Sequence, residues 1–333
     1  MTLRAAVVGC GFIGASGTNP AGGIQSHAAA WRAHPGVTLA GLVDPDPERR
    51  DAAAARWGAP AFESVAAMLA AIRPQVVSVA TPDATHAEVL GLVLAAPSVR
   101  AVLAEKPLAL DPVAAERLAA EASERGIVLS VNHVRRFAPS HRQLARWLGG
   151  GPIGPIELVR GCYTRGLKLN GTHWLDLVRW LVGEIDAVEG HGDVPPGADD
   201  ATIDVSLQFA GGARGRLHGL TAVPYSLFEL DLIGRDGRVR VIENGARIEC
   251  FGVGASRRFP GFRELVPVAG PDGGLADLLM HAATDLIESL TTGRLPAATG
   301  FDAVVALRLA DRALRSATAG KEGYATVDRE CRR

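Results

Sequence analysis

Lys106 is the residue of this sequence best suited to proton transfer. It lies in Ala104-Glu105-Lys106-Pro107, directly after the apolar run Val99–Leu103, which is typical of a buried parallel strand. Open α/β sheets bind their ligands at the carboxyl ends of such strands. A lysine at that edge can exchange a proton with a bound molecule, because burial and a nearby positive charge both lower the pKa of an ammonium group. The alternative is an ordinary surface lysine that precedes a helix.

A glycine turn near the N-terminus indicates a second kind of chemistry. Gly9-Cys10-Gly11-Phe12-Ile13-Gly14 follows the predicted strand Ala5–Val8 directly. Glycines in the pattern G-x-G-x-x-G allow a tight turn and the close approach of the backbone to a pyrophosphate, which the next helix N-terminus then favours. We therefore predict a dinucleotide site. The alternative is a glycine-rich turn without a ligand.

Asp44, which ends the next predicted strand, supports NAD as the cofactor. Its carboxylate can accept hydrogen bonds from ribose hydroxyls and would repel a 2′-phosphate. Arg49 and Arg50 are close in sequence and keep NADP possible. The insertion Ala15–Ser26 places Asp44 further from the glycines than the usual ~20 residues. It is either a loop over the ligand or a surface insertion without a function.

The first part of the chain alternates short apolar runs with alanine-rich, charged segments, which predicts a doubly wound parallel sheet. The predicted strands are Ala5–Val8, Leu39–Val43, Val76–Val79, Val99–Leu103 and Ile127–Val131. The predicted helices are Pro47–Trp57, Val65–Ile72, Ala87–Ala95 and Pro112–Arg125. Asp111 is expected to cap the last helix at its start, and Gly126 at its end.

The pattern changes after Asn132, where strands follow one another with turn signals between them. This predicts an antiparallel or mixed sheet. The predicted strands are Glu157–Thr164, Thr202–Phe209, Ala213–Leu220, Leu227–Ile233 and Val239–Glu243. Helices are expected at Thr172–Leu181, Leu275–Thr291 and Asp302–Ala319, and a loop at Gly190–Asp200.

Two α/β domains follow from this division. Residues 1–132 are predicted to form a Rossmann domain, and residues 133–333 a substrate-binding and oligomerisation domain. The second domain is expected to have a mostly antiparallel sheet. We expect its solvent-facing side to be apolar and to favour a homo-oligomer, either a dimer or a tetramer.

Composition limits the partners and the location of the protein. Charged residues make up 21% of the chain, the net charge is −1, and no basic tract points to nucleic acid. No apolar stretch reaches the roughly 20 residues of a membrane helix. The four cysteines are far apart and have no metal-binding spacing, so no metal site is expected. We predict a cytoplasmic protein with free thiols.

Four motifs in order resemble the Gfo/Idh/MocA family, which includes glucose-fructose oxidoreductase and inositol dehydrogenase. They are the glycine turn, Thr81-Pro82-Asp83-Ala84-Thr85-His86, Glu105-Lys106-Pro107 and Asn132-His133-Val134-Arg135-Arg136-Phe137. The resemblance continues through Gly171-Thr172-His173-Trp174-Leu175-Asp176. It implies a Rossmann domain, a C-terminal domain with a large open sheet, NAD(P), and a sugar, polyol or nucleotide sugar as substrate.

The resemblance also implies roles for single residues. Lys106 matches the family's catalytic lysine, and His173 the histidine of its substrate helix. The predicted cofactor site comprises Gly9, Gly11, Phe12, Ile13, Gly14, Asp44, Thr81, Pro82, His86, Glu105 and Lys106. The predicted substrate site comprises Lys106, Arg136, Tyr163, Lys168, Asn170 and His173.

Leu169 departs from the family pattern, since many of these dehydrogenases carry an aspartate four residues before the histidine. Leucine can neither transfer a proton nor accept a hydrogen bond. The leading hypothesis remains hydride transfer between nicotinamide and a carbinol or carbonyl carbon of a carbohydrate-like substrate, with Lys106 as proton-transfer residue and His173 as its assistant. The alternatives are a non-catalytic NAD-dependent binding or regulatory protein and an NAD-assisted glycoside hydrolase.

Overall fold

The computed structural model of the protein describes residues 2–18 and 23–319 and the short strand Ala325–Thr326. Residues 19–22 of the insertion and Cys331 lie outside the described residues. The chain divides into two compact units, one made of Met1–Phe137 with Ala276–Val304 and the other of Ala138–Leu275 with Val305–Arg333. Residues 276–304 are therefore grouped with the N-terminal unit, whereas we expected them in the second domain.

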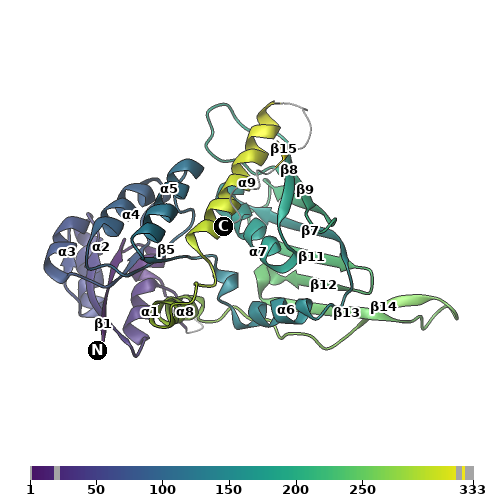
Figure 1. The fold of residues 1–333 in the computed structure, drawn as a ribbon, viewed down its shortest axis with the longest axis horizontal. Coiled ribbons are helices and arrows are strands. Elements are labelled where there is room, and N and C mark those ends of the chain that lie inside the picture. Colours follow the sequence, from purple (N-terminus) through teal and green to yellow (C-terminus); the bar gives the residue numbers. More distant parts are fainter. Residues whose placement is uncertain (1, 19–22, 320–324, 327–333) are drawn as a thin grey trace. The chain divides into compact units, whose positions relative to one another are not determined.

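A six-stranded sheet forms the first unit (Figure 1). Its order is β3-β2-β1-β4-β5-β6 and all its pairings are parallel, which confirms the predicted doubly wound sheet. The strands are β1 Leu3–Val8, β2 Val37–Val43, β3 Ala61–Phe62, β4 Val76–Val79, β5 Ala101–Ala104 and β6 Val128–Val131. Apolar side chains bury these strands on both faces. The two-residue β3 was not predicted.

The helices of this unit include the four predicted for the first domain, α1, which was not predicted, and α8, which was expected in the second domain. They are α1 His27–Ala33, α2 Pro47–Trp57, α3 Val65–Ile72, α4 His86–Ala95, α5 Pro112–Glu124 and α8 Leu278–Thr292. Asp111 caps α5 as expected, because its carboxylate accepts hydrogen bonds from the backbone N–H groups of Val113 and Ala114. Gly126, with a φ of +66°, follows the helix end.

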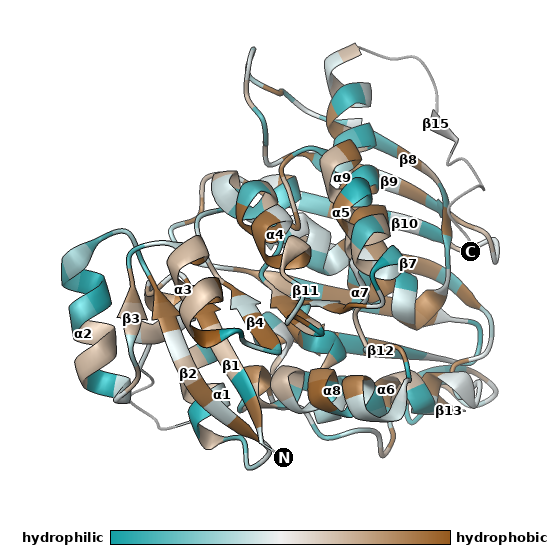
Figure 2. Ribbon diagram, turned by 60° about the vertical axis from the view of Figure 1, so that its left-hand side comes forward, coloured by the Kyte–Doolittle hydropathy of each residue, from teal (hydrophilic) through white to brown (hydrophobic). Residues whose placement is uncertain are grey.

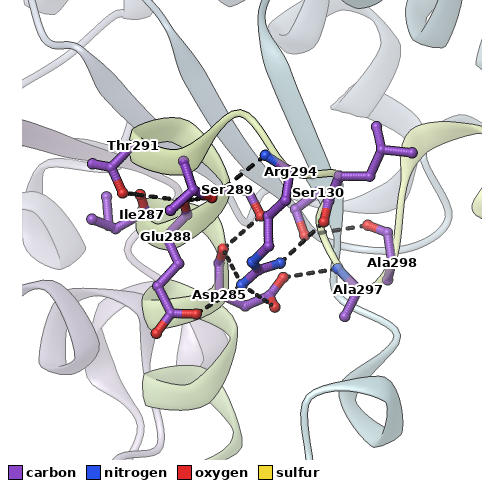
Figure 3. Close-up of polar contacts among 11 residues, drawn as sticks. Ser130, Asp285, Ile287, Glu288, Ser289, Thr291, Arg294, Ala297 and Ala298 are labelled. Atoms are coloured by element: carbon purple, nitrogen blue, oxygen red, sulfur yellow. Dashed lines mark hydrogen bonds and ion pairs between the residues drawn. The ribbon is translucent and has the colours of Figure 1, made fainter.

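A buried carboxylate fastens α8 and the segment after it into the first unit (Figure 3). Asp285 is 2% exposed and accepts hydrogen bonds at 2.9 Å from both the Arg294 guanidinium and the Ala297 backbone N–H. One residue further on, the carbonyl of Ala298 accepts a hydrogen bond from the Ser130 hydroxyl in β6. These contacts hold the end of β6 in place, and β6 leads directly into the candidate site.

The second unit contains a nine-stranded sheet in the order β14-β13-β12-β11-β7-β10-β9-β8-β15. All its pairings are antiparallel except that of β7 with β10, so the mostly antiparallel sheet is confirmed. Its longer strands are β7 Ile156–Thr164, β8 Ile185–His191, β9 Asp204–Phe209, β10 Arg214–Leu220, β11 Phe228–Gly234, β12 Gly237–Ile242, β13 Arg247–Ala255 and β14 Arg263–Pro267. β8, β13 and β14 were not predicted, and β8 includes the first residues of the expected loop 190–200.

Helices cover one face of this sheet (Figure 2). They are α6 Pro139–Gly149, α7 Thr172–Val182 and α9 Gly300–Ala319, of which α9 begins in the first unit. Packing of α7 against β7 is close, because a Cβ on Gly161 would lie 2.1 Å from Nε1 of Trp174. Alternate strand residues, such as Val159 and Leu230, complete this buried face.

The opposite face of the sheet carries charged side chains that pair across the strands. Asp231 of β11 accepts hydrogen bonds from Arg160 of β7 at 2.8 Å and from Arg238 of β12 at 2.7 Å. On the neighbouring strands, Arg240 pairs with Glu249 at 2.9 Å. The expectation of an apolar surface here was therefore wrong, because the outward-pointing strand positions hold charged residues. The oligomer itself stays a prediction.

In residues 2–18 and 23–319, no helix combines the length and the apolar character that crossing a membrane requires.

Candidate cofactor and catalytic site

Glycine occurs at the three positions of the turn after β1 for different physical reasons. Gly9 has a φ of +98°, and a Cβ there would lie 2.3 Å from the carbonyl oxygen of Ala80. A Cβ on Gly14 would lie 1.9 Å from the carbonyl oxygen of Gly9. The fold therefore requires glycine at both positions. A Cβ on Gly11, in contrast, would meet nothing within 4 Å, so the chain's own packing leaves the space beside Gly11 open.

The helix that follows the turn is shorter than the motif predicts. Phe12–Ser16 forms a single wide turn, in which the backbone N–H of Ser16 donates to the carbonyl of Gly11 at 3.0 Å. The rest of the insertion follows this turn, and α1 begins only at His27, where the Ser26 hydroxyl caps it. The insertion therefore separates the glycine turn from the long helix that usually follows it directly.

Asp44 lies directly after β2 and is 5% exposed. One carboxylate oxygen accepts a hydrogen bond from the backbone N–H of Cys10 at 2.8 Å, and the other from that of Asp46 at 3.0 Å. Arg49 lies 3.4 Å from the second oxygen and 3.3 Å from the Asp46 carboxylate. Asp44 thus holds the glycine turn through the backbone of Cys10, and its carboxylate oxygens can still accept hydrogen bonds from a ligand.

A cavity of about 730 Å³ opens at this edge of the first unit. It brings together seven of the predicted cofactor residues, namely Gly9, Gly11, Phe12, Ile13, Asp44, Thr81 and Pro82. Its size and its mixture of apolar walls with few polar groups are those of a cofactor pocket. The Thr81 hydroxyl oxygen is buried and forms no hydrogen bond with any described residue. Both features fit a bound dinucleotide, which would form a hydrogen bond with the Thr81 hydroxyl and fill the open space beside Gly11.

His86, also predicted to contact the cofactor, joins two loops of this edge. Its ring is 1% exposed, with Nε2 at 2.8 Å from the carbonyl oxygen of Thr81 and Nδ1 at 2.6 Å from that of Pro107. Both ring nitrogens therefore face backbone carbonyl oxygens of the protein. His86 holds the backbone on either side of the cavity edge, and through Pro107 it holds the segment that carries Lys106.

Glu105, next to Lys106, lies in a buried polar network that the sequence did not predict. Its Oε1 is 3.0 Å from Nε2 of His27 and accepts a hydrogen bond from the Asn132 amide at 2.6 Å. Burial alone would raise the pKa of Glu105, but the contacts with His27 and Asn132 and the nearby charge of Lys106 hold it below its ordinary value. The carboxylate is therefore kept ionised beside Lys106. A buried histidine at the start of a helix gave no signal in the sequence.

In the second unit, His173 is half-buried in the first turn of α7. The preceding segment 166–171 is a single wide turn whose backbone is fastened by Asp200. The Asp200 carboxylate accepts hydrogen bonds from the backbone N–H groups of Lys168 at 2.8 Å and Leu169 at 3.0 Å. The Leu169 side chain is 38% exposed.

Other predicted substrate residues of this unit make contacts within the fold. The Tyr163 side chain is fully buried, and its hydroxyl donates to the carbonyl and accepts from the N–H of Ile203. The Lys168 ammonium lies 3.1 Å from the Asp311 carboxylate. The Asn170 amide donates to the carbonyl of Thr164 at 2.9 Å. These contacts favour a structural role for the three side chains.

Arg136, a predicted substrate residue of the first unit, is similarly enclosed. It is 7% exposed and its guanidinium donates to the carbonyl of Ala297 and to the Asp302 carboxylate, both at 3.2 Å. The contacts tie the residues after β6 to the start of α9. They are structural and give no support to a substrate contact.

Neither a metal centre nor a reactive thiol was found in the part of the chain that the structure describes. No group of three or more His, Cys, Asp or Glu side chains could hold a metal ion there. Cys10, Cys162 and Cys250 are free thiols. Burial and the charge of Asp44 raise the pKa of Cys10 to about 12, so the thiol inside the glycine turn stays protonated.

The fold of the first unit and the cavity at its strand ends are those of a dinucleotide-binding protein. Residues 3–133 match the Gfo/Idh/MocA oxidoreductase family with its NAD-binding Rossmann fold, and residues 165–240 match a C-terminal domain of the same family. The chain belongs to the Gfo/Idh/MocA family, and NAD is the cofactor of its Rossmann domain.

Relatives extend over most of the chain. An inositol 2-dehydrogenase of Rubrobacter xylanophilus is 29% identical, with 92% of this chain and 91% of the relative covered. A UDP-N-acetylglucosamine 3-dehydrogenase of Acidithiobacillus ferrooxidans is also 29% identical, over 83% of this chain and 86% of the relative. The crystal structure of GenD2 from gentamicin A biosynthesis, in complex with NAD, is 26% identical with a TM-score of 0.79, covering 98% of this chain and 97% of that one.

Proposed function

We propose that the protein is an NAD-dependent dehydrogenase that oxidises a CH–OH group of a cyclic polyol, sugar or nucleotide sugar, or reduces the corresponding carbonyl. The observation that carries this proposal is the cavity beside Gly11 and Asp44, at the same sheet edge at which β5 delivers Lys106. The names of the relatives, which act on inositol and on UDP-N-acetylglucosamine, support the substrate class. NAD, when bound, supplies the site that accepts or returns hydride.

Lys106 is cast as the residue that takes the proton of the substrate hydroxyl during oxidation and returns it during reduction. A general base must be positioned within hydrogen-bond reach of the proton that it accepts, and a strand end braced by its neighbours provides a fixed position. His86 and Glu105 brace the segment on either side of Lys106. His173 is assigned to substrate binding and to assistance in proton transfer.

Asp44 favours NAD over NADP. Arg49, which could otherwise pair with a 2′-phosphate, already lies between the carboxylates of Asp44 and Asp46. Asp44→Ala is expected to weaken NAD binding and to narrow the preference over NADP. Tighter binding of NADP than of NAD by the unaltered protein, measured by isothermal titration calorimetry, would show that this interpretation of Asp44 is wrong.

The substrate class is tested by NADH absorbance with a panel that includes myo-inositol, scyllo-inositol, free hexoses and UDP-N-acetylglucosamine. We expect NAD reduction with at least one of these compounds. A protein that binds NAD and one of these ligands without hydride exchange would instead be a binding or regulatory protein, for which Leu169 is the sequence feature in favour. Release of free sugar from a glycoside without net NADH would indicate hydrolysis. The homo-oligomer and the cytoplasmic location stay predictions.

A further inference from the structure

A chain of buried hydrogen bonds leads from α1 through β4 to the carboxylate beside Lys106. Trp31 Nε1 lies 2.7 Å from the Ser78 hydroxyl, which lies 3.0 Å from Nδ1 of His27. On the other side of its ring, His27 Nε2 lies 3.0 Å from Oε1 of Glu105. Trp31, Ser78 and His27 are completely buried, so water does not compete for these bonds.

The direction of this chain follows from the chemistry of its first member. The indole nitrogen of Trp31 can only donate, so Ser78 Oγ accepts from it. Ser78 then has one proton to give, and the acceptor it faces is Nδ1 of His27. Nδ1 is therefore the unprotonated nitrogen of the ring, and Nε2 carries the proton that it donates to Glu105.

The opposite direction leaves a buried proton unsatisfied. If Nδ1 of His27 carried a proton and donated it to Ser78, then Ser78 Oγ would accept from two donors. Its own proton would then have no acceptor among the residues that the structure describes. A buried donor without an acceptor has lost its hydrogen bond to water and gained none in return, so the first direction is favoured.

We propose that His27 is a positioning residue for the reaction, because it orients Glu105 and through it fixes the electrostatic surroundings of Lys106. Asn132 completes the arrangement by donating to the same carboxylate oxygen at 2.6 Å. The ionised carboxylate has Lys106 as a charged neighbour. This inference rests on the proposed function of Lys106, and it adds a group that never touches the substrate.

The ring tautomer is tested first, on the full chain saturated with NAD. Nitrogen-15 NMR of histidine-labelled protein, with His27→Gln to assign the signal, is expected to show His27 as a neutral ring protonated at Nε2. A ring protonated at Nδ1 alone, or at both nitrogens, would overturn the direction of the chain.

The influence on Lys106 is tested by carbon-13 NMR of lysine side chains. The protein has only three lysines, Lys106, Lys168 and Lys321, and Lys106→Met assigns the relevant signal. His27→Leu, which cannot donate to Glu105, is expected to shift the Lys106 signal. His27→Gln, whose amide can donate, is expected to restore it towards the wild-type position. The signal of Lys168, in the other unit, should stay unchanged in both variants.

A purely structural role for His27 predicts another result. The two variants would then lose thermal stability to similar extents and leave the Lys106 signal where it was, which would overturn the proposal. If His27→Leu does not fold, Ser78→Ala takes its place in the experiment. This smaller change removes only the hydroxyl that orients His27, and it is expected to shift the Lys106 signal as well. Wild-type turnover by Lys106→Met would contradict the proposed function instead, so the two failures are distinguishable.

Discussion

The two units use their predicted site residues in different ways. In the first unit, backbone geometry gathers the glycine turn, Asp44, Thr81 and Pro82 around one cavity. In the second unit, Tyr163, Lys168 and Asn170 are bonded to neighbouring backbone and side chains of their own unit. A site built from the backbone at strand ends is therefore easier to recognise in a sequence than the role of a single side chain such as Tyr163 or Lys168, because the partners Ile203 and Asp311 lie far along the chain.

The glycine turn provides the largest expected effect. Gly14→Ala places a Cβ against the carbonyl of Gly9, so we expect a protein with a lower melting temperature that no longer binds NAD. Gly11→Ala is the matched control, because its Cβ meets only open space. We expect this variant to fold normally and to bind NAD about tenfold or more weakly, which corresponds to about 1.4 kcal/mol. Unchanged NAD affinity in Gly11→Ala, by calorimetry, would refute the ligand explanation of that glycine.

Tyr163 separates a structural from a substrate-binding role in the second unit. Tyr163→Phe leaves the backbone N–H and carbonyl of Ile203 without their buried partner, so we expect a loss of about 1–3 kcal/mol in the free energy of unfolding. The KM for substrate should change little. Tyr225→Phe, at a side chain that is 56% exposed, is the control and should unfold like the wild type. A raised KM with unchanged stability would restore Tyr163 to the substrate site.

Asp311 is expected to give a small effect that depends on pH. Burial alone would raise its pKa, but Arg315 and Lys168 hold it below the ordinary value of 3.8. A carboxylate whose pKa is lower in the folded than in the unfolded state stabilises the fold at pH values above its unfolded-state pKa. This contribution is lost as the pH falls through the folded-state pKa. Asp311→Asn should therefore be less stable than the wild type at pH 7, in urea unfolding. The difference should shrink below about pH 4, and a difference independent of pH would contradict the ion pair.

Much of the fold could be predicted because its signals are local. Mostly apolar runs of four or five residues predicted β1, β4 and β6, and Asp111 predicted the start of α5. β13 and β14 escaped prediction, because their mixed sequences become strands only through pairing with β12 and with each other. The outward face of the large sheet was wrongly expected to be apolar. Its charged side chains form ion pairs with partners on neighbouring strands, and such pairs cannot be recognised in the sequence of one strand.

The candidate site could be predicted where motif and backbone coincide. Gly9, Gly14 and Asp44 were found because a strand, a turn and a second strand end place them together. His27 and Ser78 were not found, because each is a single polar residue in an apolar or alanine-rich stretch. Their meaning arises only when α1, β4 and β5 come together in the folded unit.

The central claim is that Lys106 carries the proton transfer of an NAD-dependent dehydrogenase, and the turnover of Lys106→Met tests it most directly. Methionine keeps most of the side-chain bulk and removes the ionisable amine, so folding and NAD affinity should stay near wild type. With a substrate identified from the panel, we expect NADH formation to fall by roughly two to four orders of magnitude, the scale of losing a general acid–base group. His173→Ala should lose less. Turnover at the wild-type rate by Lys106→Met would contradict the account.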